Sequence, residues 1–284
     1  MFKNLSIFRL NGSDFDLSTL NKFAEPLPGE MSSSGFVDPR DTGIFHRVLD
    51  NVILNFRVDK KVIPKSAIDA KTRERVAKIE LESNFKLGRK ALKEVRNEIT
   101  DELMHRALCS TSYTAVWLDL KNGWLVINSS SQGIIDDIIH KIIASVDNFP
   151  IESFSVKRNA SEAMNEWLSS GEAPIGFTID SDAVMQATGD SKSAVKYSNQ
   201  VVSDLEMLRR TEEGKTCVSL AMTWRDKISF VLTDCVTIKK VKILNVLKSS
   251  LANEEGFDSE FSLMAMELNL MLSELVGELG GFSK

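Results

Sequence analysis

Short stretches of alternating apolar and polar residues recur along the chain, separated by turn-forming residues. A two-residue period is typical of strands that bury one face. Two such stretches flank Asn122 and Gly123, a pair that favours the tight turn of a hairpin, and residues 48–58 show a second hairpin pattern around Asp50 and Asn51. The pattern predicts strands at 2–10, 48–58, 114–120, 124–128, 176–179, 216–222, 227–232 and 237–243.

A period of three to four residues dominates positions 67–107 and predicts a long helical segment. Pro64 precedes it, near the first helical position, where the missing N–H of proline does little harm. Gly88 is expected to divide the segment in two. The residues expected to face inward from its second half are Leu92, Val95, Ile99 and Leu103. Further helices are predicted at 16–24, 134–146, 161–168, 203–210 and 257–279.

The order of these elements indicates the fold class. The strands are mostly joined as hairpins, and the helices come in blocks instead of alternating regularly with strands. This arrangement favours an α+β fold with antiparallel sheets over a doubly wound parallel sheet.

Composition excludes several classes of protein. The chain of 284 residues is 43% hydrophobic and 26% charged, as is ordinary for a soluble globular protein of one large domain or two smaller ones. No uncharged apolar run of about 18 residues predicts a membrane span, and the first residues do not resemble a secretion signal. Three cysteines stand far apart, at Cys109, Cys217 and Cys235, which favours reduced thiols in the cytoplasm.

None of the patterns that mark common catalytic sites is complete. Gly171 and Gly176 have the spacing of a phosphate-binding loop, but Phe177 follows where a lysine is required. No histidine has a second His or Cys at metal-ligand spacing. The sequence therefore predicts a non-enzymatic protein without catalytic residues, metal or cofactor.

Charge is distributed unevenly along a chain whose net charge is −5. Between positions 60 and 96, twelve Lys and Arg residues stand against five acids, which leaves a net charge of +7. Positions 239–248 hold a second basic cluster, whereas 254–278 contain seven acids and no base. This asymmetry predicts one basic and one acidic face. On charge pattern alone, a basic helix that is merely solvated is as good an interpretation as a surface that binds a polyanion.

The bases of the helical segment recur at helical spacing and predict two ridges. The ridges comprise Lys86, Arg89, Lys90 and Lys93, and, one helix earlier, Lys71, Arg75 and Lys78. In the second basic cluster, strand alternation would turn Lys240 and Lys242 to one side and Lys239 to the other. Phe85 is the only aromatic residue in the basic helical segment. Contact with phosphates therefore explains binding of a nucleic acid better than base stacking does.

Several stretches, taken in order, resemble one known family over nearly the whole chain. They include Phe2-Lys3-Asn4-Leu5, Gly35-Phe36-Val37-Asp38-Pro39, Lys61-Val62-Ile63-Pro64, Trp117-Leu118-Asp119 with Asn122-Gly123, Glu166-Trp167-Leu168-Ser169-Ser170-Gly171, and the terminal Leu279-Gly280-Gly281. In sequence and spacing these stretches resemble the RdgC family of recombination-associated proteins.

The resemblance implies a horseshoe-shaped α+β subunit, divided into a central scaffold at 1–62 and 112–182, a basic helical arm at 63–111 and a C-terminal lobe at 183–284. Two subunits would close head to head and tail to tail into a ring dimer. Its hole would accept double-stranded DNA without reading sequence, and binding of single-stranded DNA is left open. The family is linked to restraint of the RecA recombinase. The resemblance also implies a nucleoid-associated protein of the cytoplasm.

The two ridges and the second basic cluster indicate which residues would line the hole, and the resemblance indicates the subunit contacts. Those expected to line the hole are Lys71, Arg75, Lys78, Lys86, Arg89, Lys90, Lys93, Lys196, Lys240 and Lys242. Leu108 stands where the family has an aromatic residue at a subunit contact, and is the predicted dimer contact. At the second contact, residues 199–202 depart from the family pattern, and the nearest cations are Lys192 and Lys196. The alternative function is a protein–protein adaptor that acts on recombination proteins, which would depend less on salt than a phosphate binder.

Overall fold

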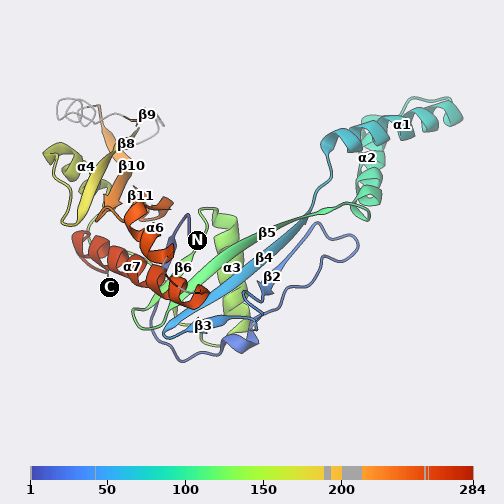
Figure 1. Ribbon diagram of the computed structural model, residues 1–284. Coiled ribbons are helices and arrows are strands. Elements are labelled where there is room, and N and C mark those ends of the chain that lie inside the picture. Colours follow the sequence, from blue (N-terminus) through green and yellow to red (C-terminus); the bar gives the residue numbers. More distant parts are fainter. Residues whose placement is uncertain are drawn as a thin grey trace.

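The computed structural model describes residues 2–41, 43–188, 193–199, 213–252, 254 and 256–283, and these form an α+β chain with two antiparallel sheets (Figure 1). The α+β prediction is therefore confirmed. The strands are β1 (Ser6–Leu10), β2 (Ser32–Val37), β3 (His46–Val48), β4 (Asn51–Lys61), β5 (Cys109–Asp119), β6 (Trp124–Ile127), β7 (Ile151–Ser153), β8 (Phe177–Ala187), β9 (Ala194–Tyr197), β10 (Lys215–Trp224), β11 (Ile228–Thr233) and β12 (Ile238–Ile243). The α-helices are α1 (Lys65–Ser83), α2 (Arg89–Met104), α3 (Gln132–Ser145), α4 (Ala160–Ser170), α6 (Asn245–Ala252) and α7 (Phe257–Glu278).

A seven-stranded sheet forms the centre of the molecule, in the order β2-β4-β5-β6-β1-β7 with β3 paired to β4. The predicted hairpin around Asn122 and Gly123 joins β5 to β6. One face of the sheet packs against α3, where Leu54, Leu118 and Ile138 are fully buried. Strand alternation sends neighbouring side chains such as Trp117 to the opposite face, where they join a second core.

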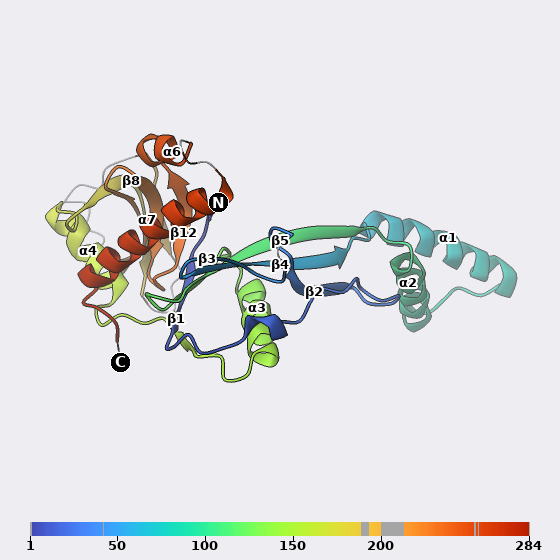
Figure 2. The same cartoon turned by 60° about the horizontal axis from the view of Figure 1, so that its bottom comes forward.

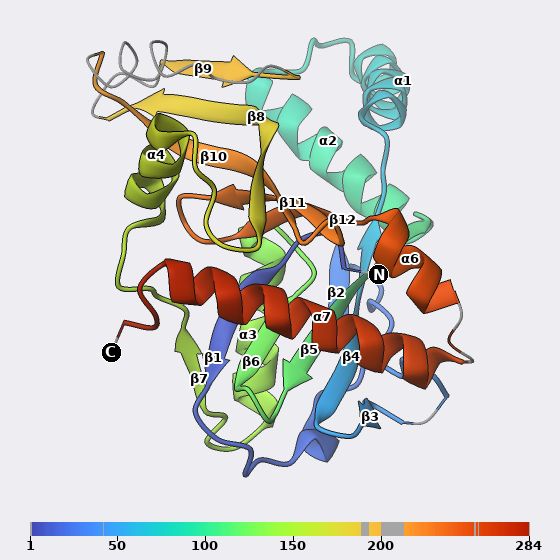
Figure 3. The ribbon, with the colours of Figure 1, turned by 60° about the vertical axis from the view of Figure 1, so that its left-hand side comes forward.

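That second core lies around α7, between the two sheets (Figures 2 and 3). The five-stranded sheet has the order β12-β11-β10-β8-β9. Trp124 of the large sheet donates to Asn269 of α7 at 2.9 Å, and Trp224 of the small sheet donates to Glu274 at 2.7 Å. The helix therefore ties the two sheets together through both apolar burial and indole hydrogen bonds.

The position of α7 corrects one expectation. Eight α7 residues are buried inside this chain. The acidic segment is not wholly a solvated face, because Glu267 is buried and pairs with Lys227 at 2.5 Å. Tertiary packing thus uses most of the helix, although Met266 and Leu270 stay exposed.

The N-terminal third departs most from prediction. The helix predicted at 16–24 is wrong, since only Leu17–Thr19 form a short 3-10 turn, capped by Asp16. The backbone of Phe23 instead donates to Phe36 at 2.8 Å. Strand β2 was not predicted, and its pairing with β4 competes successfully with local helix formation. In the hairpin predicted around Asp50, the turn residues are Leu49 and Asp50, one position earlier than expected.

The other helices predicted within the described residues agree with the structure. Helices α3, α4 and α7 confirm those expected at 134–146, 161–168 and 257–279, and the long segment splits into α1 and α2 around Gly88. The helix predicted at 203–210 lies outside the described residues. Position 182, the predicted end of the central scaffold, falls inside β8 of the five-stranded sheet.

Candidate nucleic-acid interface

The basic arm consists of α1 and α2, which continue from the far ends of the paired strands β4 and β5. Lys61 and Cys109 form the last pair of that ladder, so the sheet fixes where the arm begins. The two helices pack on each other through Val95 and Ile99, while α1 has no buried residue. Leu92, predicted to face inward, is 37% exposed, because the inward stripe extends only from Val95 towards Met104.

On α1, the structure brings together the cations of the predicted ridge at positions 71–78. Lys71, Arg75 and Lys78 line one hollow of about 290 Å³, with Glu74 and Glu102 beside them. Arg75 donates to both oxygens of Glu102 on α2, at 3.0 and 3.2 Å. This ion pair braces the two helices and partly neutralises Arg75, whereas Lys71 and Lys78 are exposed.

The second ridge lies at the start of α2. Arg89, Lys90 and Lys93 occupy its first turns, but Lys86 lies in the connection before the helix, so the predicted four-residue helical ridge is wrong at that position. Lys86 is left out because the helix begins only after its N-cap at Gly88.

The electrostatics of this helix end favour an anion. Helix N-termini carry a partial positive charge, so cations there are unfavourable by roughly 0.3–1 kcal/mol each, and α2 has no acid in its first turn. The free N–H groups and the side chains of Arg89 and Lys90 therefore concentrate positive potential in one place.

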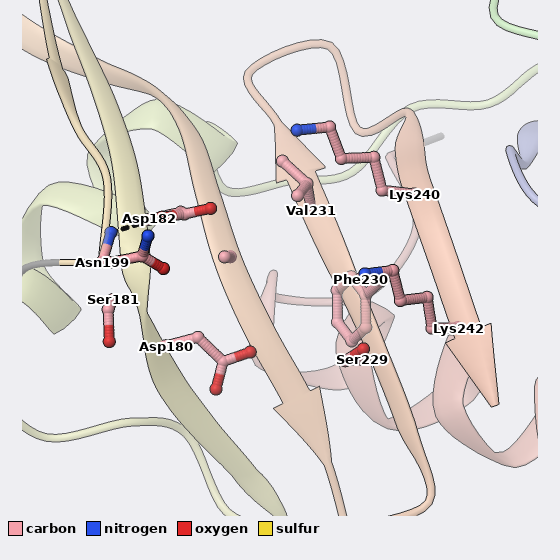
Figure 4. A pocket seen from close by; sticks show the side chains of 10 residues that line it. Asp180, Ser181, Asp182, Asn199, Ser229, Phe230, Val231, Lys240 and Lys242 are labelled. Atoms are coloured by element: carbon pink, nitrogen blue, oxygen red, sulfur yellow. Dashed lines mark hydrogen bonds between the residues drawn. The ribbon is translucent and has the colours of Figure 1, made fainter. Parts of the chain in front are cut away.

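In the five-stranded sheet, Lys240 and Lys242 of β12 point into the same hollow of about 330 Å³ (Figure 4). The register between β11 and β12 shifts between Ser229 and Val231, and Lys240 has a φ of 54°. A bulge of this kind re-aims a side chain at a cost in backbone strain. Lys239 lines the neighbouring hollow, which Lys240 also borders.

Two carboxylates that the sequence analysis missed share the hollow of Lys240 and Lys242. Asp180 accepts from the Thr223 hydroxyl at 2.9 Å, and Asp182 accepts from the Asn199 backbone at 2.8 Å (Figure 4). They repel phosphate, so a polyanion on this face would be held towards β12. Their alternation in the stretch Asp180-Ser181-Asp182 was the only sequence signal that they share a face.

Lys196 lies on β9 and is exposed. Its cross-strand partner is Val184, two residues from Asp182, so pleat alternation puts Lys196 on the open face of the hollow. The arm and this face stand at opposite ends of the seven-stranded sheet in Figure 1, so the predicted cations form two separate groups. Lys192 and residues 200–202 lie outside the described residues.

Leu108, the predicted subunit contact, connects α2 to β5 and is 84% exposed. Its carbonyl accepts from the Val62 N–H at 3.0 Å, so the backbone is held while the side chain points into solvent. Val62 is itself 53% exposed, which makes the base of the arm an apolar spot beside the basic helices.

Two kinds of feature are absent from the part of the chain that the structure describes. Among the described residues, no three or more His, Cys, Asp or Glu side chains gather as they would around a metal ion. Within the same residues, no helix is both long and apolar enough to cross a membrane.

Comparison with known proteins gives a consistent result over the full length. A family model described as "Putative exonuclease, RdgC" matches residues 1–282. A protein of Burkholderia cenocepacia, called recombination-associated protein RdgC, is 40% identical over 293 residues, covering 99% of this chain and 95% of the relative. Proteins of the same name are 39% identical in a Janthinobacterium species and 35% identical in Bordetella pertussis, each covering 99% of this chain and 98% of the relative.

Proposed function

The chain belongs to the RdgC family of recombination-associated proteins, and on that premise we propose that it binds DNA without reading sequence, as a ring-shaped homodimer around the duplex. Phosphate contacts dominate this binding, because the candidate side chains are Lys and Arg and not groups arranged to read base edges. By occupying the duplex, the ring restrains recombination of the RecA type.

The observation that carries the proposal is the arm. It presents exposed cations on two helices that have almost no core of their own, and the chain maintains it in spite of the unfavourable charge at the start of α2. Lys71, Lys78 and Lys93 make no ion pair with any described residue, which leaves them available to phosphates.

The ring requires two subunit contacts. Leu108 supplies the first, as an exposed apolar side chain on a fixed backbone next to the arm. The second contact lies at the other end of a horseshoe-shaped subunit, and the residues that form it are left open. Two-fold symmetry follows, since each contact then pairs the same surface of both copies.

The first experiment is a DNA titration at two salt concentrations, with DNA fragments of unrelated sequence. If six to ten phosphates are contacted, affinity should fall by roughly 10³–10⁵ between 50 and 200 mM salt. All sequences of equal length should bind alike. A selection from random DNA that returns one short sequence would refute the proposal, and so would binding that ignores salt.

The second experiment tests encirclement. A ring loaded on closed circular DNA should survive a high-salt challenge, whereas on linear DNA of the same length it should slide off the ends. The mass in solution should be about twice the 31.7 kDa of one chain. A monomer at micromolar concentration, or equal loss from both DNA forms, would argue against the ring.

The remaining alternatives need separate assays. An adaptor would bind the recombinase through apolar contacts that persist in high salt without DNA. The description of the matching family names an exonuclease, whereas we propose a binding protein without catalytic residues. Release of nucleotides from labelled DNA with Mg²⁺ or Mn²⁺, at a rate proportional to the amount of protein, would overturn that part of the proposal.

A further inference from the structure

The tip of the arm exposes two large apolar side chains. Leu81, in the last turn of α1, is 82% exposed, and Phe85, in the connection to α2, is 78% exposed. The end of α1 projects beyond α2 in both Figure 1 and Figure 2 and forms the outermost part of the arm. Burying such side chains is favourable by roughly 1.5–3 kcal/mol each, so the exposure of two of them four residues apart indicates a binding surface.

The turn that carries Phe85 is a defined structure. Asn84 closes α1 in the left-handed conformation, with a φ of 55°. The N–H of Leu87 donates to the carboxylate of Glu80 at 2.9 Å, whereas the Ser83 hydroxyl donates to the carbonyl of Ile79 at 2.7 Å and lies 3.4 Å from the carbonyl of Phe85. Leu87 is half-buried against the arm, while Phe85 points away from it. The hydrogen bond between Leu87 and Glu80 therefore fixes the turn that carries the exposed ring.

Positive charge flanks the two apolar side chains along the chain. From position 78 to 90 the tip carries four cations and two acids, and the carboxylate of Glu80 is occupied by the turn. The four cations are Lys78, Lys86, Arg89 and Lys90. Two exposed apolar side chains flanked by cations in the sequence have the composition of a wedge that enters the DNA minor groove, where Phe and Leu partly unstack one base step while cations hold the adjacent phosphates.

We propose that Leu81 and Phe85 form such a wedge, inserted into the base stack of the DNA that the arm binds. The inference rests on the proposed DNA binding and adds a contact with bases to the contacts with phosphates. One aromatic side chain per arm provides one intercalating contact. It adds affinity at any sequence, because every base pair offers a stacking face.

The charge around the tip favours DNA over a second copy of the chain as its occupant. A symmetric contact of two tips would bring eight cations together against four acids, and like charges repel at that distance. A contact between subunits therefore suits Leu108 better, where the adjoining exposed side chain is Val62.

A tryptophan at the tip gives a direct readout. All four native tryptophans are at most 5% exposed, so Phe85→Trp would supply the one exposed indole among the described residues. On saturation with duplex DNA, its emission should be quenched by stacking and protected from acrylamide. Ile175→Trp, at a position 87% exposed in the body, is the matched control and should keep its emission.

The second measurement uses substitutions at the tip and a reporter base in the DNA. Leu81→Ala with Phe85→Ala should weaken binding about tenfold, within the range for one lost stacking contact, and leave the salt slope unchanged. With 2-aminopurine in the duplex, the native protein should raise base fluorescence and the double variant should not. Ile175→Ala should behave like the native protein in both assays.

The outcomes separate the wedge from the function on which it rests. If the native protein fails to bind DNA, the proposed function is refuted, and the wedge with it. If it binds but the indole emission of the Phe85→Trp variant and the 2-aminopurine fluorescence stay constant, DNA binding stands and the wedge is wrong. If the indole of that variant becomes protected without DNA as protein concentration rises, the tip belongs to a subunit contact and the proposal is overturned.

Discussion

The arm and the body of this protein are built on different physical grounds. In the body, two sheets and the helices α3 and α7 enclose two large cores in which side chains such as Trp117, Leu118 and Ile138 are fully buried. In the arm, two helices share a narrow contact around Val95 and Ile99, and most of their other side chains are exposed. The body is thus specified by burial, whereas the composition of the arm fits the DNA binding proposed for it.

The largest expected effect is on binding. Reversing three arm cations together, Lys86→Glu, Arg89→Glu and Lys93→Glu, should abolish DNA binding, because each phosphate contact contributes nearly one unit of the log–log salt slope and the reversed charges then repel. The dimer should stay intact, since none of the three lies at Leu108. Fluorescence anisotropy with labelled duplex and mass in solution measure the two properties.

The matched control for this variant reverses three exposed cations of the body, Lys22, Lys121 and Lys157, to give the same net charge. It should bind far more strongly than the arm variant. Equal affinities of the two variants would mean that total charge and not the arm governs binding, and unchanged binding by a folded arm variant would place the DNA surface elsewhere.

A second prediction concerns stability. Ile138→Ala in the body core should lower the free energy of unfolding by about 2–5 kcal/mol, through lost burial and a residual cavity. Ile99→Ala removes the same groups from the arm, where local opening relieves most of the effect on global unfolding. Tryptophan fluorescence in denaturant reports the body, which holds all four tryptophans, and hydrogen exchange reports the arm. Equal global losses would show that arm and body unfold as one unit.

A third prediction compares two cations on the same helix. Lys71→Gln should reduce the salt slope by roughly one unit. Arg75→Gln should reduce it by less, because Glu102 already neutralises part of the Arg75 charge. If Arg75→Gln reduces the salt slope more than Lys71→Gln does, DNA must displace Glu102 and pair with the Arg75 guanidinium in its place.

The smallest effects concern thiol reactivity. Burial raises the pKa of the Cys217 thiol to about 12, so almost no thiolate forms at pH 8. The nearby charge of Asp234, aided by burial, raises the pKa of the Cys235 thiol, whereas Cys109 is exposed at the base of the arm. Alkylation followed by mass spectrometry should modify Cys109 first, Cys235 next and Cys217 last. Rapid labelling of Cys217 in the native protein would reveal opening of the body core.

Local patterns in the sequence were sufficient for much of the fold. The hairpin of β5 and β6, the helices α3 and α4 and the division of the arm at Gly88 depend on turn chemistry and on periods of two or three to four residues. These signals act within a few residues of the chain. The helix predicted at 16–24 failed because pairing of Phe23 with Phe36, a non-local contact, was the stronger interaction.

The candidate site divides in the same way. Helical spacing predicted that Lys71, Arg75 and Lys78 share a side, and their common hollow agrees. It did not predict that Glu102 pairs with Arg75, since that depends on how α2 packs against α1. The exposed apolar tip was also missed, because Phe85 gave no periodic signal and only the projection of α1 past α2 places it in solvent.

The sequence by itself determined the class of fold, the basic arm and the family, because periodicity, charge and ordered motifs are properties of the chain. Only the tertiary structure decided that α7 is buried between two sheets, that the register of β11 and β12 shifts between Ser229 and Val231, and that carboxylates share the hollow of Lys240 and Lys242. These features arise from pairing between strands and helices far apart in sequence. Their geometry is set by packing and register, which no local pattern encodes.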